Sequence, residues 1–382
     1  MEIKEVIVDK KIPTLTKVQQ DIFEAVNDGK IQELKIILST NKIKVDFVDE
    51  NGMTPLQHAC YKGSKDIVEM LIDHGADPNK CDHPHQYTPL HFAALSGNAD
   101  LCQLLLSAGA KSSALNSVGR TPSQMAAFVG NHHCSVMINN FIPKSTLDYY
   151  LVPQGLQTEP MLSPVIADSF YSLITQINIH PVRVLMNLQK YPGLRDNLPM
   201  IRSVLELMRK KEMSKGSETN EVLAFKYSYL YTIVNEIIKF EDQTARINNG
   251  EEKNEDDKPK QDVISLFIRK LIKPPMKGCS PFMDTLLKKA VYDFSYHDSA
   301  IFRQIAATLS TPDPPSCLSV IVSAINGQRA FDDDAKNCDT CNEEKAMKKC
   351  SKCKKVQYCD RECQKTHWFI HKLSCDNLNE EQ

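Results

Sequence analysis

Apolar and turn-forming residues repeat with a long period in the first third of the chain. Four glycines are spaced 34, 34 and 33 residues apart, and eight positions after each comes an isoleucine or a leucine. The glycines are Gly29, Gly63, Gly97 and Gly130, and the aliphatic residues are Ile37, Leu71, Leu105 and Ile138. Thr-Pro pairs that begin at residues 54, 88 and 121 keep the same register. Because threonine caps a helix, proline fits its first turn and glycine ends it, the pattern predicts four units of two short helices.

This repeat resembles the ankyrin repeat. The string Thr-Pro-Leu-His-x-Ala is intact at residues 88–93, and the period matches ankyrin helix pairs. Gln20 and Asp21 replace Thr-Pro in repeat one, and repeat four lacks Leu-His after its Thr-Pro pair, as terminal repeats often do. The resemblance implies an ankyrin solenoid of four repeats over residues 18–142, with a concave face that commonly binds proteins. A spacer without a partner is the alternative.

The second helix of each repeat should end at a residue that tolerates a left-handed backbone. Gly75 and Gly109 stand at this position in repeats two and three, and Asn41 stands there in repeat one. Glycine and, less readily, asparagine adopt positive φ angles. We therefore expect all three residues to have this conformation.

Two small clusters within the repeats contain metal-ligand or catalytic residue types. Residues 81–85 read Cys-Asp-His-Pro-His, but no second ligand pair follows at zinc-site spacing, so a loop that contacts a partner is the preferred interpretation. Residues 131–134 read Asn-His-His-Cys and, with Gly-Glu-Glu at 250–252, faintly resemble SET methyltransferase motifs. The repeat register argues against such a site, because Asn131 should open the second helix of repeat four.

The middle of the chain, residues 147–330, reads as a series of helices separated by prolines. The spacing of apolar residues predicts helices near 165–180, 198–213, 221–240, 262–273, 282–297 and 316–327. Apolar residues surround most of the 221–240 helix, which should therefore be buried on more than one side. Residues 241–262 hold eight acidic and four basic residues, a composition that predicts a disordered loop. No catalytic set can be argued in this region.

The C-terminal part carries the strongest chemical signal. Eight soft ligands follow one another between residues 338 and 375 as Cys338, Cys341, Cys350, Cys353, Cys359, Cys363, His371 and Cys375. Eight ligands make two four-coordinate sites, and zinc prefers thiolate and imidazole donors in closed tetrahedral shells. We expect two structural Zn²⁺ ions whose binding supplies the folding energy of this short segment, on the order of 10 kcal/mol per site.

The ligand spacing resembles that of a MYND finger over residues 336–375. That resemblance implies interleaved ligation: Cys338, Cys341, Cys359 and Cys363 hold one zinc, and Cys350, Cys353, His371 and Cys375 hold the other. His367 falls outside the pattern. The resemblance also implies a groove for proline-containing peptides, lined here by Gln364 and Trp368, the only tryptophan. The alternative is that Trp368 packs the small core of the finger.

Composition and charge narrow the possible functions. The chain holds 46 Lys and Arg against 48 Asp and Glu, so no overall positive field attracts nucleic acid or an anionic membrane. Within residues 336–375, seven thiolates and two Zn²⁺ reduce the basic surplus to about two charges, which argues against a nucleic-acid finger. No two glycines lie within nine residues, which excludes the GxGxxG, GxxxxGK[ST] and GxSxG motifs. No His is followed by Glu, so HExxH is absent.

Cysteine usage and hydropathy point to a reducing compartment. Seven of the 13 cysteines lie between residues 338 and 375, which is unlike a disulfide framework. The N-terminus is charged where a signal peptide would be apolar, and no apolar run of about 18 residues occurs. We therefore expect a cytoplasmic protein without a membrane span.

Together these features predict a mainly α-helical chain with an ankyrin solenoid, a helical middle region and a two-zinc MYND finger. This arrangement is similar to the family of ankyrin-repeat and MYND-domain-containing proteins, and strings at residues 49–56, 116–121, 125–130 and 363–369 resemble it locally. The resemblance implies a non-enzymatic adaptor that helps to traffic signalling membrane proteins to the primary cilium. The alternatives are a nuclear transcriptional co-regulator that recruits partners through its finger, and a methyltransferase related to MYND-bearing enzymes.

Overall fold

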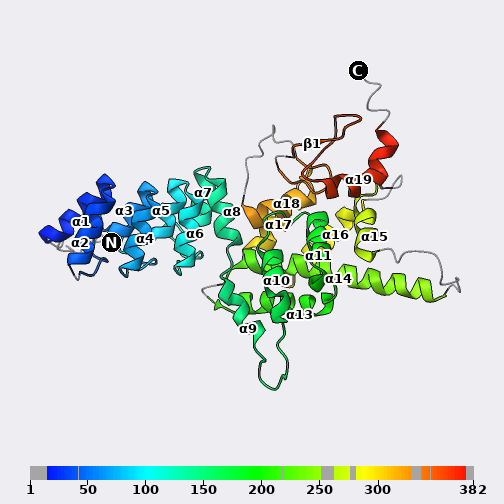
Figure 1. The fold of residues 1–382 in the computed structure, drawn as a ribbon, viewed down its shortest axis with the longest axis horizontal. Coiled ribbons are helices and arrows are strands. Elements are labelled where there is room, and N and C mark those ends of the chain that lie inside the picture. The colour runs from blue at the N-terminus through cyan, green and yellow to red at the C-terminus, as the bar shows by residue number, and fades with distance from the viewer. Residues whose placement is uncertain are drawn as a thin grey trace, which may run out of the picture. The chain divides into compact units, whose positions relative to one another are not determined.

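The computed structural model describes residues 15–41, 43–216, 219–250, 262–275, 281–327, 337–344 and 346–375. The chain forms two compact units, Met1–Pro143 and Lys144–Gln382, and almost all of its regular structure is helical (Figure 1). Within the described ranges, none of the helices combines the length and the apolar character needed to cross a membrane.

The described part of the first unit consists of four helix pairs, as the repeat predicts. The pairs are α1 (Lys17–Asp28) and α2 (Ile31–Thr40), α3 (Pro55–Lys62) and α4 (Lys65–Asp73), α5 (Pro89–Ser96) and α6 (Ala99–Ser107), and α7 (Pro122–Phe128) and α8 (His132–Asn140). The first helices α1, α3, α5 and α7 contact one another in order, and the second helices form a parallel layer (Figure 1). One continuous apolar core, which includes Leu34, Leu71 and Leu105, lies between the two layers.

Repeats two, three and four begin as the sequence predicts. The hydroxyls of Thr54, Thr88 and Thr121 accept hydrogen bonds from the backbone N–H three residues later, and a proline occupies the first helical position. The periodic glycine then ends the first helix, as Gly63 does with φ of 72°. A side chain at this φ would be strained, so the glycine is required for the turn between the two helices.

Repeat one departs from the expected register at both ends. Its first helix begins one turn early, because Thr16 and not Gln20 forms the N-terminal cap and accepts from the N–H of Gln19. The expectation of a left-handed Asn41 is wrong: its φ is −112°, and its side-chain amide donates to the carbonyl of Ile37. That hydrogen bond satisfies a carbonyl at the end of the helix, so no left-handed residue is needed.

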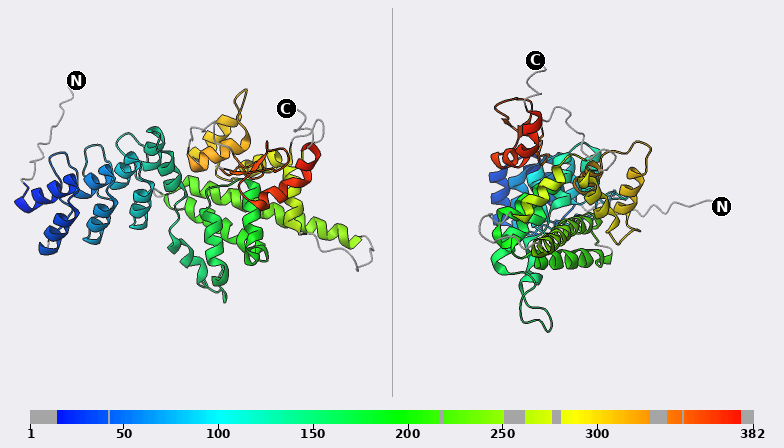
Figure 2. Two further views of the ribbon diagram at one scale, coloured as in Figure 1. Left: turned by 45° about the horizontal axis from the view of Figure 1, so that its top comes forward. Right: turned by 90° about the vertical axis from the view of Figure 1, so that its right-hand side faces the viewer.

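The second unit contains a helical region built around one long helix. Its elements are η1 (Lys144–Leu147), α9 (Asp148–Leu151), η2 (Pro164–Ile166), α10 (Ala167–Thr175), α11 (Pro181–Lys190), α12 (Pro192–Arg195), α13 (Leu198–Met213), α14 (Glu221–Gly250), α15 (Val263–Ile272), α16 (Phe282–Tyr292), α17 (Ala300–Leu309) and α18 (Cys317–Asn326). Helix α14 contacts α13, α15, α16, α17 and α18 (Figures 1 and 2). Phe225, Tyr229 and Ile233 of α14 are fully buried, in agreement with a helix covered on several sides.

The helical region also differs from the sequence expectations. Helix α14 continues to Gly250, so residues 241–250 do not belong to a disordered loop; residues 251–261 lie outside the described part. The predicted helix at 165–180 ends at Thr175, and α11 begins separately at Pro181. Proline disfavours a helical residue before it, so the chain breaks at this point and re-enters a helix through the cap His180. The helices predicted from the sequence include neither α11 nor α17.

The finger lies in the same unit as the helical region. It consists of a short antiparallel pair, β1 (Lys348–Lys349) and β2 (Gln357–Tyr358), followed by α19 (Arg361–Ser374). Helix α19 packs beside α15 (Figure 2). The guanidinium of Arg269 on α15 lies 5.6 Å from the ring centre of Phe369 on α19. The finger is therefore not a free appendage of the chain.

Candidate zinc centres and interaction surfaces

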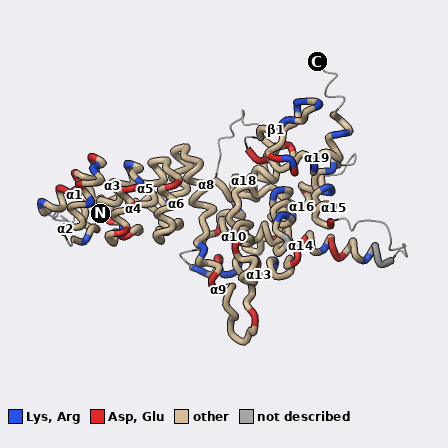
Figure 3. Tube along the Cα trace, in the orientation of Figure 1, with Lys and Arg blue, Asp and Glu red and all other residues tan. Residues whose placement is uncertain are grey.

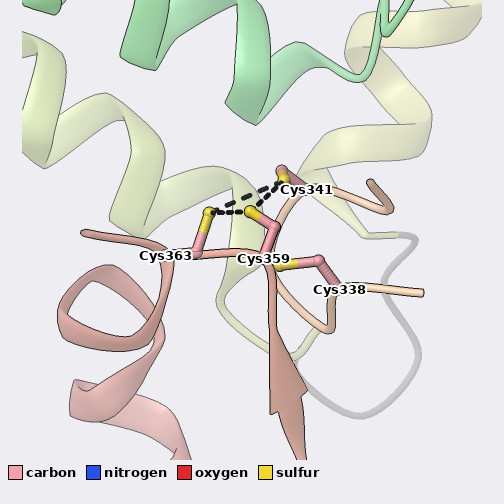
Figure 4. Close-up of side chains that lie close together, drawn as sticks. All are labelled: Cys338, Cys341, Cys359 and Cys363. Atoms are coloured by element: carbon pink, nitrogen blue, oxygen red, sulfur yellow. Dashed lines mark hydrogen bonds between the residues drawn. The ribbon is translucent and has the colours of Figure 1, made fainter. Parts of the chain in front are cut away.

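The first four-cysteine set, which we call tetrad one, converges from three segments of the finger. Cys338 and Cys341 lie in a turn, Cys359 follows β2, and Cys363 lies in the first turn of α19 (Figure 4). The sulfur atoms of Cys341, Cys359 and Cys363 are 3.4 to 3.7 Å apart. A tetrahedral zinc with bonds of about 2.3 Å holds its sulfurs about 3.8 Å apart. Tetrad one therefore fits a structural zinc ion.

Tetrad two uses the other half of the finger. The sulfurs of Cys350 and Cys375 are 3.9 Å apart, and the Cys353 sulfur is 3.4 Å from Nε2 of His371. The ligand atoms within each tetrad all lie within 4.8 Å of one another. The two sets are those that the MYND resemblance implies, and together they fit two structural zinc ions.

Both Cys-x-x-Cys turns have the same backbone design. The N–H of Asn342 donates to the carbonyl of Cys338, and the N–H of Lys354 donates to the carbonyl of Cys350. Asn342 and Lys354, each directly after the second cysteine of its pair, have φ of 55°. A residue with this left-handed conformation reverses the chain direction, so both sulfurs of a cysteine pair face the same tetrad.

Helix α19 connects the two centres. Its cap Asp360 accepts from the N–H of Cys363, which fixes a ligand of tetrad one at the start of the helix. His371 and Cys375 supply ligands of tetrad two at its end. His367 belongs to neither tetrad: its Nδ1 lies 3.1 Å from the hydroxyl of Tyr358, and its ring stacks on His371. Burial lowers the pKa of His367, whose ring packs against Tyr358 and His371.

The cysteines of tetrad one share thiol hydrogen bonds. Bonds with Cys341 and Cys363 lower the pKa of Cys338, and the bonds with Cys338 raise the pKa values of Cys341 and Cys363. A thiolate is the form that binds zinc, and the metal displaces the remaining protons. The tetrad is thus a donor set suited to a closed, structural site and offers no open position for substrate.

Gln364 and Trp368 lie one turn apart on α19, and therefore on the same face of the helix. The Trp368 side chain is 44% exposed, and its ring makes an edge contact with His371 at 5.8 Å between centres. The contact places the indole against a member of tetrad two and leaves much of the ring open to solvent. Exposed lysines gather beside tetrad two, at residues 348, 349, 352, 354 and 355 (Figure 3).

The loop at residues 81–85 packs aromatic side chains and does not form a metal site. Among the described residues, tetrads one and two are the groups of three or more ligands close enough to hold an ion. The His83 ring instead stacks on Tyr87 and meets the edge of Phe92, which in turn contacts the exposed Tyr61. We call His83, Tyr87, Phe92 and Tyr61 the aromatic cluster of the ankyrin unit.

The faint methyltransferase pattern has a structural explanation. The Asn131 side chain donates to the carbonyls of Ala94 and Leu95, so it ties repeat four to repeat three. Cys134 is fully buried in the repeat core. Of the second part of that pattern, Glu251 and Glu252 lie outside the described residues.

Side chains of the helical region reach tetrad one in contacts that the sequence does not predict, and two of them form hydrogen bonds with it. Arg183 and Asn178 lie in and just before α11, more than 150 positions from the cysteines that they contact. The local sequence carries no signal for such a pairing, since His180-Pro181 marks only the start of a helix.

Comparisons with known proteins agree with this architecture. Family models match ankyrin repeats, in three copies, at residues 22–116 and a MYND finger at residues 338–375. Both are protein-interaction domains. The chain is 32% identical to Dauer abnormal formation protein 25 of Caenorhabditis elegans over 372 residues, which cover 94% of this chain and 91% of that protein.

Other similarities are confined to single modules. Ankyrin repeat and SAM domain-containing protein 6 of Rattus norvegicus is 36% identical over 72 residues, or 19% of this chain and 8% of that protein. N-lysine methyltransferase SMYD2 of the same species is 44% identical over 43 residues, 11% of this chain and 10% of the enzyme, and this match is a partial one to the finger. Because the nematode relative is similar across almost its whole length, the chain belongs to the family of ankyrin-repeat proteins with a C-terminal MYND finger that includes Dauer abnormal formation protein 25.

Proposed function

We propose that this chain is a non-enzymatic adaptor that binds proteins at two surfaces. The observation that carries the proposal is the presence of two different interaction modules, at opposite ends of a chain whose relative is similar throughout. The zinc-ligand sets support it, because closed four-coordinate shells give the finger a structural metal and leave no position for a reaction.

The first surface is the concave face of the ankyrin unit. The aromatic cluster supports this part of the proposal, because Tyr61 is 61% exposed and rests on the edge of buried Phe92. Large rigid rings of this kind supply contact area at a low entropic cost. The partner is a protein and not nucleic acid, in keeping with the near-neutral charge of the chain.

The second surface is the face of α19 that carries Gln364 and Trp368. Its ligand is a proline-containing peptide, held by the indole ring and the neighbouring amide. The exposure of Trp368 and its contact with the zinc ligand His371 support this role, since a bound metal would hold the ring in place. The eight cysteine and histidine residues of the two tetrads are the zinc ligands.

The cargo follows from the family resemblance. The adaptor acts in the cytoplasm and carries signalling membrane proteins to the primary cilium, without inserting into the membrane itself. The rival is a nuclear co-regulator that recruits partners through the same finger. The two functions differ in where the protein resides and in what its loss does to ciliary cargo.

A pull-down from ciliated cells with a Trp368→Ala variant tests the proposal. Loss of a central aromatic anchor typically costs about 2 kcal/mol or more, which is about thirtyfold in affinity. We expect the partners of the finger to be lost and the partners of the ankyrin unit to be retained. Leu373→Ala is the matched control, because it removes an exposed apolar side chain from the same helix.

Unchanged partners in the Trp368→Ala variant would assign this ring to the core of the finger and refute the peptide groove. Imaging of the same cells separates the rivals. Nuclear residence, with normal ciliary cargo after deletion of the gene, would refute the trafficking role. Methyl transfer from S-adenosylmethionine by the purified chain would refute the non-enzymatic assignment.

A further inference from the structure

The helical region places a cation directly against tetrad one. Nη2 of Arg183, on α11, donates to the sulfur of Cys359 at 3.0 Å. The same guanidinium lies 3.6 Å from a carboxylate oxygen of Glu343 and 3.6 Å from one of Asp360. Only 18% of the Arg183 side chain is exposed. One side chain from outside the finger thus contacts a ligand and two acidic groups that flank the ligands.

Two further side chains complete this contact. The amide of Asn178 donates to the carbonyl of Cys341 at 3.1 Å and to the Glu343 carboxylate at 2.6 Å. The sulfur of Met186, one turn beyond Arg183 on α11, lies 3.8 Å from the sulfur of Cys363. Arg183, Asn178 and Met186, which we call the α11 clamp, therefore reach three of the four cysteines of tetrad one.

The chemistry of a four-thiolate zinc site explains why a cation belongs here. Four thiolates and one Zn²⁺ carry a net charge of −2 in a partly buried place, where unbalanced charge is costly. The half-buried guanidinium of Arg183 meets this charge at the sulfur of Cys359 and lies near the carboxylates of Glu343 and Asp360. The planar, permanently charged guanidinium presents its donors in a rigid fork, so it can contact a sulfur and two carboxylates at the same time, whereas a lysine ammonium is a compact point charge on a flexible stem.

The neighbouring histidine cannot supply this charge. Burial lowers the pKa of His180 to about 4, so its ring is neutral at pH 7. Its Nδ1 accepts from the N–H of Val182 and thereby caps α11. His180 thus fixes the start of the helix that presents Arg183.

We propose that Arg183 is a positioning residue of the four-cysteine zinc site, supplied from outside the finger, and that zinc in tetrad one anchors the finger to the helical region. Donors that orient and neutralise metal ligands commonly raise metal affinity ten- to a hundredfold. The coupling works in both directions: the clamp stabilises the zinc, and the zinc-bound cysteines give the clamp a fixed surface. The inference rests on the zinc fit and does not depend on which partners the chain binds.

The test uses the full chain loaded with zinc and an Arg183→Gln variant. Zinc transfer to a chromophoric chelator reports both equivalents. In the variant we expect one equivalent to be lost at a chelator strength about ten to a hundred times lower than in the unmodified chain, and the other to be retained as before. Arg269→Gln is the matched control, because it removes a guanidinium from the α15–α19 contact but not from a zinc ligand.

Hydrogen–deuterium exchange over residues 176–190 supplies a second readout. We expect this segment to lose protection when the unmodified chain gives up its zinc, and to be less protected in Arg183→Gln before any chelation. Arg183→Lys keeps the charge without the planar fork, so its zinc release should lie between the two. This variant also serves if Arg183→Gln does not fold.

Zinc release that is the same in Arg183→Gln, Arg269→Gln and the unmodified chain would overturn the proposal. Equal weakening of both zinc equivalents, together with lost protection in α13 and α14, would also overturn it, because Arg183 would then serve only the fold of the helical region.

Discussion

At the scale of single residues, one position decides how neighbouring ankyrin repeats are joined. Gln57 accepts from the N–H of Thr54 and donates to the carbonyl of Tyr87 in the next repeat. His91 occupies the same position one repeat later: Nδ1 accepts from the N–H of Thr88, so Nε2–H donates to the carbonyl of Arg120. The imidazole of His91 thus accepts one hydrogen bond and donates another, as the Gln57 amide does. Only the neutral ring can do both.

Because histidine occupies the position that glutamine holds in the preceding repeat, we expect the stability of this repeat to depend on pH. Burial lowers the pKa of His91 below its ordinary value of 6.5. Below about pH 6.5 the unfolded chain therefore binds more protons than the folded chain. The contribution of His91 to the free energy of unfolding is complete above that pH, and it is lost as the pH falls through the pKa of His91 in the folded chain. Protonated His91 could no longer accept from Thr88.

We expect His91→Gln to fold with both hydrogen bonds intact and to abolish this loss of stability in acid. Hydrogen–deuterium exchange of α5 between pH 7.5 and 5.5, corrected for the intrinsic exchange rate, measures it in the full chain. His133→Gln, which alters an exposed histidine of the same unit, should behave like the unmodified chain. The same acid response in His91→Gln would show that another group carries it.

At the scale of elements, metal ligands determine the finger. Helix α19 carries Cys363 near its start and His371 near its end, and the two strands hold only two residues each. Such a segment buries too little apolar surface to fold alone, so zinc binding, on the order of 10 kcal/mol per structural site, must supply the difference.

Removal of zinc should therefore unfold α19 and leave the ankyrin repeats folded. We expect a strong chelator to abolish amide protection over residues 361–374, with α3 to α8 unchanged, and added Zn²⁺ to restore it. Mass-resolved hydrogen–deuterium exchange of the full chain is the measurement. Protection of α19 that persists after both metals have left would contradict this account.

The same elements show what a sequence can and cannot predict. The caps and glycines of the repeats act on neighbours a few residues away, so their positions were predictable from spacing. The end of α2 was not, because the side chain of Asn41 found a local hydrogen bond that makes a left-handed turn unnecessary. Helix α14 extends to Gly250 although residues 241–250 are strongly polar, and no local pattern indicates that extension.

The finger likewise has features that the sequence predicts and features that it does not. The cysteine and histidine content predicted eight ligands for two zinc ions, and the resemblance to MYND fingers implied the two sets that lie together in the structure. The contact of Arg183 with Cys359 joins residues 176 positions apart and depends on how α11 packs. Such a tertiary contact leaves no trace in the spacing of either segment.

At the scale of the whole molecule, the chain combines a repeat stack with a helical region that carries a zinc finger. The finger and α11 share part-buried polar contacts, which join the finger to the helical region. In the proposed adaptor, a finger joined in this way would present a bound peptide in a defined direction.

The central claim is that a peptide docks on Trp368, and the fluorescence of this residue tests it most directly. Trp368 is the only tryptophan in the chain and is 44% exposed, so its emission reports this surface without labelling. The zinc-loaded full chain would be titrated with a panel of proline-containing peptides, alongside Gln364→Ala and Leu373→Ala variants.

For a peptide that binds, we predict a saturable shift of the emission to shorter wavelength, with a stoichiometry of one peptide per chain. Gln364→Ala should weaken binding and Leu373→Ala should not. Two results would contradict peptide docking on Trp368. The first is an unchanged emission spectrum with a peptide whose binding calorimetry detects, and the second is an unchanged spectrum with every peptide of the panel.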